Sequence, residues 1–239
     1  MKLHDLHPWP ATTAEAIALQ RRLAPLVVRR GGPRRVRLVA GCDLAFLGQG
    51  GRSALARAAV VLLSYPDLGI VEQQIVESPV DFPYVPGLLS FREIPALSLA
   101  FERLRGTPDL LIVDGQGLAH PRRLGIACHL GLLLDVPTIG CAKSRLVGEH
   151  AEPPSAAGAS ADLHDGGEVI GLVLRTRDGV APVFVSVGHR IGLRPAAQWV
   201  LRLCRGHRLP EPSRLADQLS KGRVPQPAAA QASDRRPGV

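Results

Sequence analysis

Two aspartates lie in apolar segments that predict buried strands. Asp43 is embedded in VAGCDLAF, and Asp114 ends the apolar run DLLIVD. A carboxylate in such a segment is destabilising unless it is paired or bound to a metal, and α/β proteins place ligand sites at the carboxyl ends of strands. Two carboxylates on neighbouring strands would hold a hard divalent cation such as Mg²⁺, for which Mn²⁺ substitutes. The alternative is that Asp43 faces solvent.

Two further charged residues lie next to predicted elements. Glu93 is in SFREIP, just before Pro95, and Lys143 is in GCAKSRL, after an apolar strand. The 29 basic residues include only two other lysines, Lys2 and Lys221. A compact ammonium beside a phosphate is a role that arginine does not fully replace. The alternatives are a Glu93 that interacts with a helix dipole in the first turn and a Lys143 in a solvated loop.

One aromatic side chain lies between two prolines in a chain with few aromatic residues. Tyr84 is in PYVP, followed by Gly87, and the stiff loop would suit stacking on nucleic-acid bases. Alternatively, the tyrosine covers the edge of the core. His120, followed by PRR, could contact a phosphate, although His120 and His189 are each more often structural. The segment GQGLAH follows a predicted strand, as a dinucleotide-binding loop does. It has His120 where such a loop needs its third glycine, so a dinucleotide site is not expected here.

The order of predicted elements indicates one α/β domain with a mixed central sheet. Thr12 and Glu15 have the spacing of a capping box, which predicts a helix within residues 11–30. Three apolar segments with short turns predict an antiparallel meander: residues 36–47, 56–65 and 69–78. Helices and buried strands then alternate, as in parallel additions to a sheet: helix 90–104, strand 109–114, helix 121–135 and strand 136–142.

The last third of the chain predicts a loop, two strands and two helices. Residues 151–167 are of low complexity and are expected to form a loop, and strands 168–176 and 182–188 suggest a hairpin across RDGVA. Helices are predicted at 194–206 and 211–221. The catalytic domain would then span residues 1–221, and residues 222–239 would form a disordered tail, because their composition cannot build a core.

Composition restricts the class of protein. The formal charge of +8 on 239 residues suits a polyanionic partner such as nucleic acid, although the excess of arginine can equally reflect the base composition of the source genome. No apolar run reaches the length of a membrane span, and MKLHDLHPWP lacks the apolar core of a secretory signal. We therefore expect a cytoplasmic protein without a membrane partner, with a monomer as the default state.

Taken together, six segments resemble the endonuclease V family of DNA and RNA repair nucleases. The resemblance runs from about residue 10 to residue 220 and is carried by VAGCDLAF, DFPYVPGLLSFREIPAL, LLIVDGQGLAHPRRLGIACHLG, PTIGCAKSRLVG, SVGHRI and RLPEPSRLAD. The second and third segments are long and specific. The resemblance implies a ribonuclease H-like fold, in which a mixed five-stranded core sheet carries the carboxylates that bind Mg²⁺.

The resemblance also implies roles for particular residues. Asp43, Glu93 and Asp114 match the family's catalytic carboxylates, with Asp43 and Asp114 as the metal ligands, and Lys143 matches a lysine near the scissile phosphate. Asp217 lies where ribonuclease H-like folds often place a late metal-site residue on a helix. The strand-separating wedge of the family corresponds to Pro83, Tyr84, Val85 and Pro86, although Val85 stands where isoleucine is more usual.

The implied reaction is metal-assisted hydrolysis of damaged DNA. The family nicks the second phosphodiester 3′ to deoxyinosine and leaves a 3′-hydroxyl and a 5′-phosphate, and some members prefer inosine in RNA. We expect the flipped base to enter a pocket where backbone groups near Gly87, Gly115 and Gly117 contact it. The alternatives are an inosine-specific ribonuclease, another ribonuclease H-like nuclease and a catalytically silent inosine-binding protein. A glycosidase is disfavoured because sugar-binding aromatics are lacking.

Overall fold

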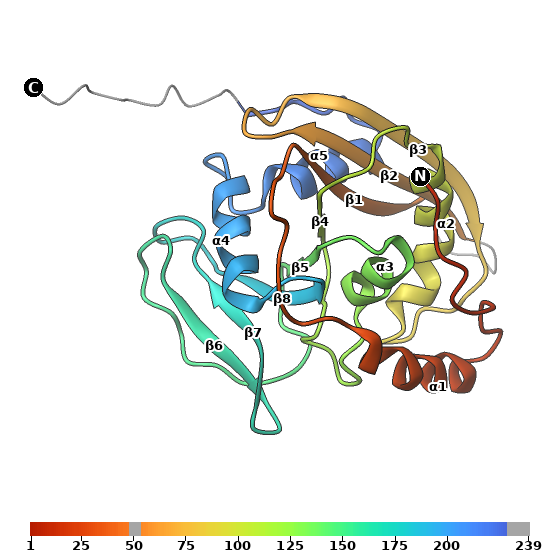
Figure 1. Ribbon diagram of the computed structural model, residues 1–239, viewed down its shortest axis with the longest axis horizontal. Helices are drawn as coiled ribbons and strands as arrows, with labels where there is room; N and C mark the ends of the chain where they lie inside the picture. The colour runs from red at the N-terminus through yellow and green to blue at the C-terminus, as the bar shows by residue number, and fades with distance from the viewer. Residues whose placement is uncertain (48–53, 229–239) are drawn as a thin grey trace, which may run out of the picture.

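The chain is built around an eight-stranded mixed sheet. The computed structural model describes residues 1–47 and 54–228. Across the sheet the strands run in the order β3-β2-β1-β4-β5-β8-β7-β6 (Figure 1). The strands are β1 Leu38–Leu47, β2 Ala54–Ser64, β3 Ile70–Val80, β4 Leu110–Val113, β5 Thr138–Ala142, β6 Ser160–Asp165, β7 Glu168–Leu174 and β8 Val183–His189. The helices are α1 Thr13–Leu23, the short 3₁₀ helix η1 Ala24–Leu26, α2 Leu89–Arg103, α3 Ile126–Leu134, α4 Leu193–Leu203 and α5 Glu211–Ser220.

The strand directions confirm the predicted mixed sheet. β1, β2 and β3 form an antiparallel meander, and β4 and β5 are added in parallel, β4 beside β1 and β5 beside β4. These five strands are the core that the resemblance implied. β8, β7 and β6 extend it by antiparallel pairing, and β7 and β8 form the expected hairpin, with Leu174 opposite Val183.

The central strands are apolar on both sides because helices cover both faces of the sheet. Alternate residues of a strand point to opposite faces. On β2, Ala58, Val60 and Leu62 belong to one buried cluster, which includes Ile94, Leu97 and Phe101 of α2. The residues between them, Ala59, Val61 and Leu63, belong to another cluster, which includes Leu215, Ala216 and Leu219 of α5. The β1–β2 layer is therefore held between α2 and α5.

A glycine on β1 sets the distance between the sheet and α5. A Cβ atom built on Gly41 would lie 2.2 Å from both the carbonyl carbon and the carbonyl oxygen of Pro212, in the first turn of α5. Any larger side chain would push the helix away from the strand. Because Asp43 follows Gly41 by two residues and Asp217 follows Pro212 on α5, this close approach also sets how near the two carboxylates lie.

Two of the predicted elements are wrong in their bounds or type. The helix predicted over 121–135 begins only at Ile126, because Gly125 packs against the Gln116 carbonyl, where a Cβ would lie 2.1 Å from the oxygen. The segment 151–167, expected to be a loop, contains the edge strand β6. Its apolar signal is weak because Leu163 is the one residue of that strand that is buried. By contrast, the capping box of α1 is present between Thr12 and Glu15.

The start of the predicted tail lies against α5. The backbone N–H of Ala228 donates to Glu211 Oε1 at 2.6 Å, and that of Gln226 donates to Gln218 Oε1 at 2.9 Å. Residues 229–239 lie outside the described residues, so a disordered tail stays a prediction. Within the described ranges, no helix has both the length and the apolar character needed to cross a membrane.

We expect Gly41→Ala to lower the free energy of unfolding by about 1–3 kcal/mol, because its methyl group would overlap the backbone of Pro212. Urea unfolding would measure the change. Gly69→Ala is the matched control, since its new Cβ would meet nothing closer than Ser64 Oγ at 3.4 Å. Equal stability of the two variants would show that the packing of α5 on β1 is not tight.

Candidate active site

Three carboxylates from three elements converge at the carboxyl end of β4, an interior strand of the sheet. Asp43 lies on β1, Asp114 directly follows β4, and Asp217 is on α5. β1 and β4 are neighbouring parallel strands with Cys42 opposite Val113, so Asp43 and Asp114, the next residue of each, lie side by side. One oxygen atom from each carboxylate lies within 4.8 Å of the other two. Three half-buried carboxylates at this spacing can hold a divalent cation.

The electrostatics of the cluster favour a bound cation. Burial raises the pKa of Asp43, and the negative charges of Asp114 and Asp217 add to the increase. The Ser220 hydroxyl opposes this shift by donating to Asp43 Oδ2 at 2.5 Å. Like charges held together out of water repel each other unless a cation lies among them. All three donor groups are oxygens, which is the ligand set that hard divalent cations prefer.

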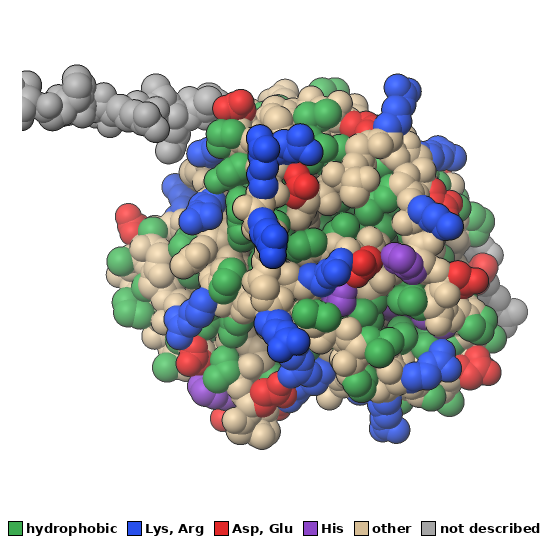
Figure 2. All heavy atoms as spheres, in the orientation of Figure 1, with side chains coloured by type: hydrophobic (Ala, Val, Ile, Leu, Met, Phe, Trp, Pro, Cys, Tyr) green, Lys and Arg blue, Asp and Glu red, His purple; other side chains and the backbone are tan. Residues whose placement is uncertain are grey.

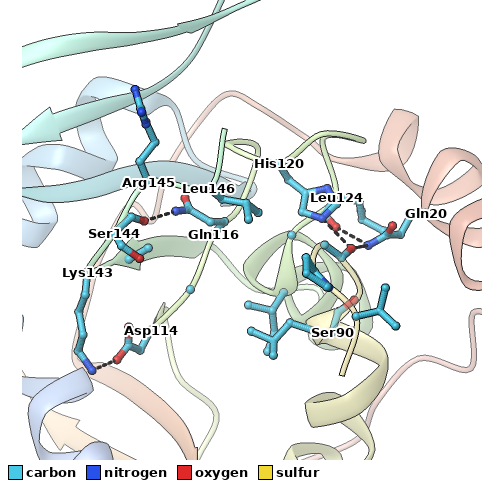
Figure 3. Close-up of a pocket in the computed structure, with 18 of the residues that line it drawn as sticks. Gln20, Ser90, Asp114, Gln116, His120, Leu124, Lys143, Ser144, Arg145 and Leu146 are labelled. Carbon is cyan, nitrogen blue, oxygen red and sulfur yellow. Dashed lines mark hydrogen bonds and ion pairs between the residues drawn. The ribbon is translucent and has the colours of Figure 1, made fainter. Parts of the chain in front are cut away.

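Two of the three lysines of the chain contact this cluster. Lys143 Nζ lies 2.5 Å from Asp114 Oδ2 and 3.6 Å from Asp217 Oδ1 (Figure 3 shows the first contact). Lys221 Nζ lies 2.6 Å from Asp217 Oδ1. Burial disfavours the charged form of Lys143, but its hydrogen bond to Asp114 and the negative charges of Asp114, Asp217 and Asp43 together outweigh this and raise the pKa of the ammonium. Lys143 therefore remains cationic beside the carboxylates.

Glu93 is a fourth carboxyl group near the cluster. It lies in the second turn of α2, not in the first turn, where it would interact with the helix dipole. Burial raises the pKa of Glu93 to about 8, and the charges of Asp43 and Asp114 contribute to the shift. In the absence of a cation, its carboxyl group is therefore mainly protonated at neutral pH.

A cavity of about 360 Å³ opens beside the carboxylates. It is lined by Gln20 of α1, residues 84–87, 89 and 90, residues 114–116, residues 120 and 124–126, and residues 142–146 (Figure 3). Asp114 and Lys143 belong to this lining and also to the carboxylate cluster. The cavity is therefore continuous with the group that could hold a cation.

The loop that carries Tyr84 forms one wall of the cavity. The tyrosine side chain is 70% exposed, so it does not cover the edge of the core. The Gly87 carbonyl oxygen accepts three hydrogen bonds: from Gln20 Nε2 at 2.9 Å, His120 Nε2 at 2.9 Å and Arg122 Nη2 at 2.8 Å. These contacts fix the end of the loop and leave the tyrosine free to project.

His120 acts as a neutral donor in this network. Its Nδ1 accepts the backbone N–H of Arg122 at 3.1 Å, so its proton must be on Nε2, which donates to Gly87. Burial lowers the pKa of His120 to about 4, and the charge of Arg122 contributes. The neutral tautomer is therefore the form that holds the loop at physiological pH.

Two buried polar side chains of the cavity wall lack a partner. Ser90 Oγ and Gln116 Oε1 make no hydrogen bond among the described residues, although the two side chains are only 2% and 8% exposed. Gln116 Nε2 donates to the Ser144 carbonyl at 2.9 Å, so the amide oxygen of Gln116 points away from Ser144. Buried groups of this kind normally have a partner, so both are available to a ligand.

The remaining predicted site residues divide into those that line the cavity and those that do not. Val85, Pro86, Gly87 and Gly115 line the cavity, whereas Pro83 does not. Gly117 packs on β8 instead, where its N–H donates to Ser186 Oγ at 2.8 Å and a Cβ would lie 2.0 Å from the Val187 oxygen. His189 is buried and its Nδ1 accepts from the backbone of Val28, which is a structural role.

Sequence reasoning missed several residues of the site: Gln20, Ser90, Gln116, Ser220 and Lys221. The scarcity of lysine was a signal for Lys221 as much as for Lys143. The other four are ordinary polar residues in the sequence, and only their burial or their long-range contacts distinguish them.

We expect Glu93→Gln to stabilise the metal-free protein increasingly as the pH rises. The folded wild type keeps a proton up to about pH 8, whereas the unfolded chain releases it near the ordinary value of 4.5, so wild type loses stability between these two values. The difference in Tm between variant and wild type should widen over this window and level off above it. Glu102→Gln, exposed on the same helix, is the control. A difference that is constant from about pH 5 to about pH 9 would contradict the assignment.

The chain is similar in sequence and fold to known proteins named Endonuclease V. The family model for Endonuclease V matches residues 21–218. Endonuclease V of Gloeobacter violaceus is 55% identical over 216 residues, which are 90% of this chain and 87% of that protein. The crystal structure of Endonuclease V from Streptomyces avermitilis is similar with a TM-score of 0.84 and 42% identity, over 90% of this chain and 93% of that one.

A third relative was solved with nucleic acid. Endonuclease V of Ciona intestinalis, in complex with a 24mer DNA containing an inosine followed by a ribo-adenosine, has a TM-score of 0.77 and 29% identity, over 87% of this chain and 95% of that one. The matches to the family model and to the Gloeobacter protein each span most of this chain. This chain therefore belongs to the Endonuclease V family of nucleases.

Proposed function

We propose that this protein repairs DNA by nicking the second phosphodiester 3′ to deoxyinosine, in a Mg²⁺-dependent hydrolysis that leaves a 3′-hydroxyl and a 5′-phosphate. The observation that carries the proposal is the continuity of the cavity with the carboxylate cluster through Asp114 and Lys143. A base bound in the cavity would hold its own strand against the cation site. The inosine-containing DNA bound by the Ciona relative supports the same class of substrate.

The unpartnered groups of the cavity suit hypoxanthine. The base carries a proton on N1, where adenine has a lone pair, and a carbonyl at C6, where adenine has an amino group. Gln116 Oε1 would accept the N1 proton, and the Ser90 hydroxyl can donate to a base acceptor. A buried acceptor facing adenine N1 would leave both groups unpaired, which disfavours adenine.

The carboxylates and Lys143 have different roles in the proposed hydrolysis. Asp43, Asp114 and Asp217 would hold Mg²⁺, or Mn²⁺ in its place, and the ion would polarise the phosphodiester and promote ionisation of the attacking water. Glu93 orients that water. Water attacks the phosphorus and gives up a proton to the solvent, the bond from phosphorus to the 3′ oxygen breaks, and that oxygen takes up a proton to become the 3′-hydroxyl. Lys143, freed from Asp114, stabilises the charge that develops on the phosphate oxygens.

Tyr84 and its neighbouring prolines would separate the strands. An exposed aromatic ring on a loop that is fixed at Gly87 can insert into the base stack while the lesion is flipped out. Inosine in RNA is a second candidate substrate, because the oligonucleotide of the Ciona complex has a ribonucleotide after the inosine.

The test of this function is a nicking assay on matched strands that carry deoxyinosine, inosine or adenine, with Mg²⁺ or EDTA. We expect metal-dependent nicking of the deoxyinosine strand by wild type. Asp43→Asn and Asp114→Asn should abolish it, because each removes a ligand charge, while Asp5→Asn, at an exposed position, should retain it. Nicking by wild type in EDTA, or undiminished nicking by Asp43→Asn, would refute the proposal. A preference for the inosine strand would assign the ribonuclease activity instead.

Gln116→Leu tests base recognition separately from catalysis. We expect it to reduce the preference for deoxyinosine over deoxyadenosine in kcat/KM by roughly 5- to 150-fold, because losing the acceptor leaves the N1 proton unsatisfied, at a cost of about 1–3 kcal/mol. Gln218→Leu, on α5 outside the cavity lining, is the control for a glutamine substitution. If Gln116→Leu kept the wild-type preference, the amide would have no part in recognising the base.

A further inference from the structure

A second depression lies behind one wall of the cavity in which we propose that the base binds (the base cavity). It has a volume of about 450 Å³ and is lined by Arg21, Ala24, Pro25, Arg29, Pro121, Arg122 and Arg123. Gln20 and His120 line the base cavity, whereas their chain neighbours Arg21 and Pro121 line this depression. The two hollows therefore lie on either side of one wall, and four arginines line the outer one.

The four arginines differ in how their charge is balanced. Arg29 Nη1 lies 2.6 Å from Glu168 Oε1, and Arg123 lies 2.8 Å from both Glu168 Oε2 and Asp165 Oδ2. Within the described part of the chain, Arg21 and Arg122 make no ion pair. Burial lowers the pKa of the Arg122 guanidinium, and the charge of Arg21 lowers it further, so the two cations lie close enough to repel.

The Arg122 guanidinium is fixed by hydrogen bonds from two of its three nitrogen atoms. Its Nε donates to Gln20 Oε1 at 2.5 Å and its Nη2 donates to the Gly87 carbonyl at 2.8 Å. Gln20, which is only 1% exposed, fixes the wall by also donating to the carbonyls of Gly87 and Leu124. Among the described residues, Nη1 of Arg122 has no hydrogen-bond partner. A guanidinium that is already ordered loses little entropy when its free edge binds an oxyanion.

We propose that Arg21 and Arg122 form a subsite for one backbone phosphate of the DNA strand, on the far side of the wall from the base cavity. The subsite rests on the proposed function, because it takes its ligand from the same DNA. Two neighbouring cations without a carboxylate are stabilised by an anion between them, and a phosphodiester supplies two oxygens in a geometry that guanidinium groups match.

The subsite is linked to the loop of residues 83–87, proposed above as the strand-separating wedge (the wedge loop), through the Gly87 carbonyl oxygen. Arg122 donates to the Gly87 carbonyl, which ends the loop that carries Tyr84. A phosphate bound at Arg122 would therefore hold the guanidinium in the position that fixes Gly87. Arg21 has no such contact in the described structure, so it should contribute to affinity alone.

A general attraction of DNA to the basic surface is the competing explanation. Figure 2 shows Lys and Arg side chains in a band along the face of the molecule in view. The segment between η1 and β1 adds the exposed arginines Arg29, Arg30, Arg34, Arg35 and Arg37. Arg29 is the matched control, because it lines the same depression and has the same charge, but its guanidinium is already paired with Glu168.

The experiment is steady-state nicking of a deoxyinosine duplex in Mg²⁺ at several KCl concentrations. We expect Arg21→Gln to reduce the slope of log kcat/KM against log salt by about 0.9, the value for one phosphate contact. The loss should appear in KM, with kcat nearly unchanged, and Arg29→Gln should change the slope by less than half as much. Arg122→Gln should, in addition, lower the preference for deoxyinosine over deoxyadenosine, because it also releases Gly87.

The outcomes separate this subsite from the proposed function. A slope for Arg21→Gln equal to that of wild type, or to that of Arg29→Gln, would overturn the subsite while wild-type nicking of deoxyinosine stands. If wild type did not nick deoxyinosine, the proposed function would fail. In that case, DNA binding by the same variants would be measured by fluorescence anisotropy at several KCl concentrations. The subsite would stand if Arg21→Gln reduced the slope of log affinity against log salt by more than Arg29→Gln did, and it would fail if the two slopes were equal.

Discussion

The mutual repulsion of Asp43, Asp114 and Asp217 is the constraint on which the rest of the site depends. Three carboxylates within 4.8 Å of one another are unfavourable in a half-buried place, and the fold nevertheless brings them together from two strands and a helix. Gly41 permits the approach of α5, and the groups around the cluster compensate its charge. Ser220 and the two lysines do so in the structure described here. A divalent cation would do so more completely and would release Lys143 toward the phosphate.

In the base cavity, in contrast to the carboxylate cluster, the buried polar groups are uncharged, and some are paired while others are not. The Gly87 carbonyl accepts from three donors, so the wall behind the wedge loop is rigid. Across the cavity, Ser90 and Gln116 present groups without partners. A rigid cavity wall with a few polar groups that lack hydrogen-bond partners favours a ligand that supplies those partners. The wall also separates the base cavity from the arginine-lined depression, so it could position a base on one side and a phosphate on the other.

The sequence predicted most of the fold, because apolar periodicity reports burial. It located the meander and the parallel additions, and it placed Asp43 and Asp114 together because each lies in an apolar strand. It missed β6, whose single buried residue leaves no pattern, and it began α3 too early because the packing of Gly125 is a tertiary contact. Ser220 contacts Asp43 across 177 residues, and Gln20 resembles any polar residue of a surface helix. Such contacts have no local signature, and Asp217 was found only through the resemblance to a family.

Mn²⁺ binding without DNA, measured by electron paramagnetic resonance, tests most directly whether Asp43, Asp114 and Asp217 form one cation site. Asp217→Asn should weaken binding by at least the roughly tenfold that even outer-shell partners contribute to metal affinity. Asp217 is the informative position because it comes from a helix and not from the sheet. Mn²⁺ affinity equal to that of wild type in Asp217→Asn would contradict the account.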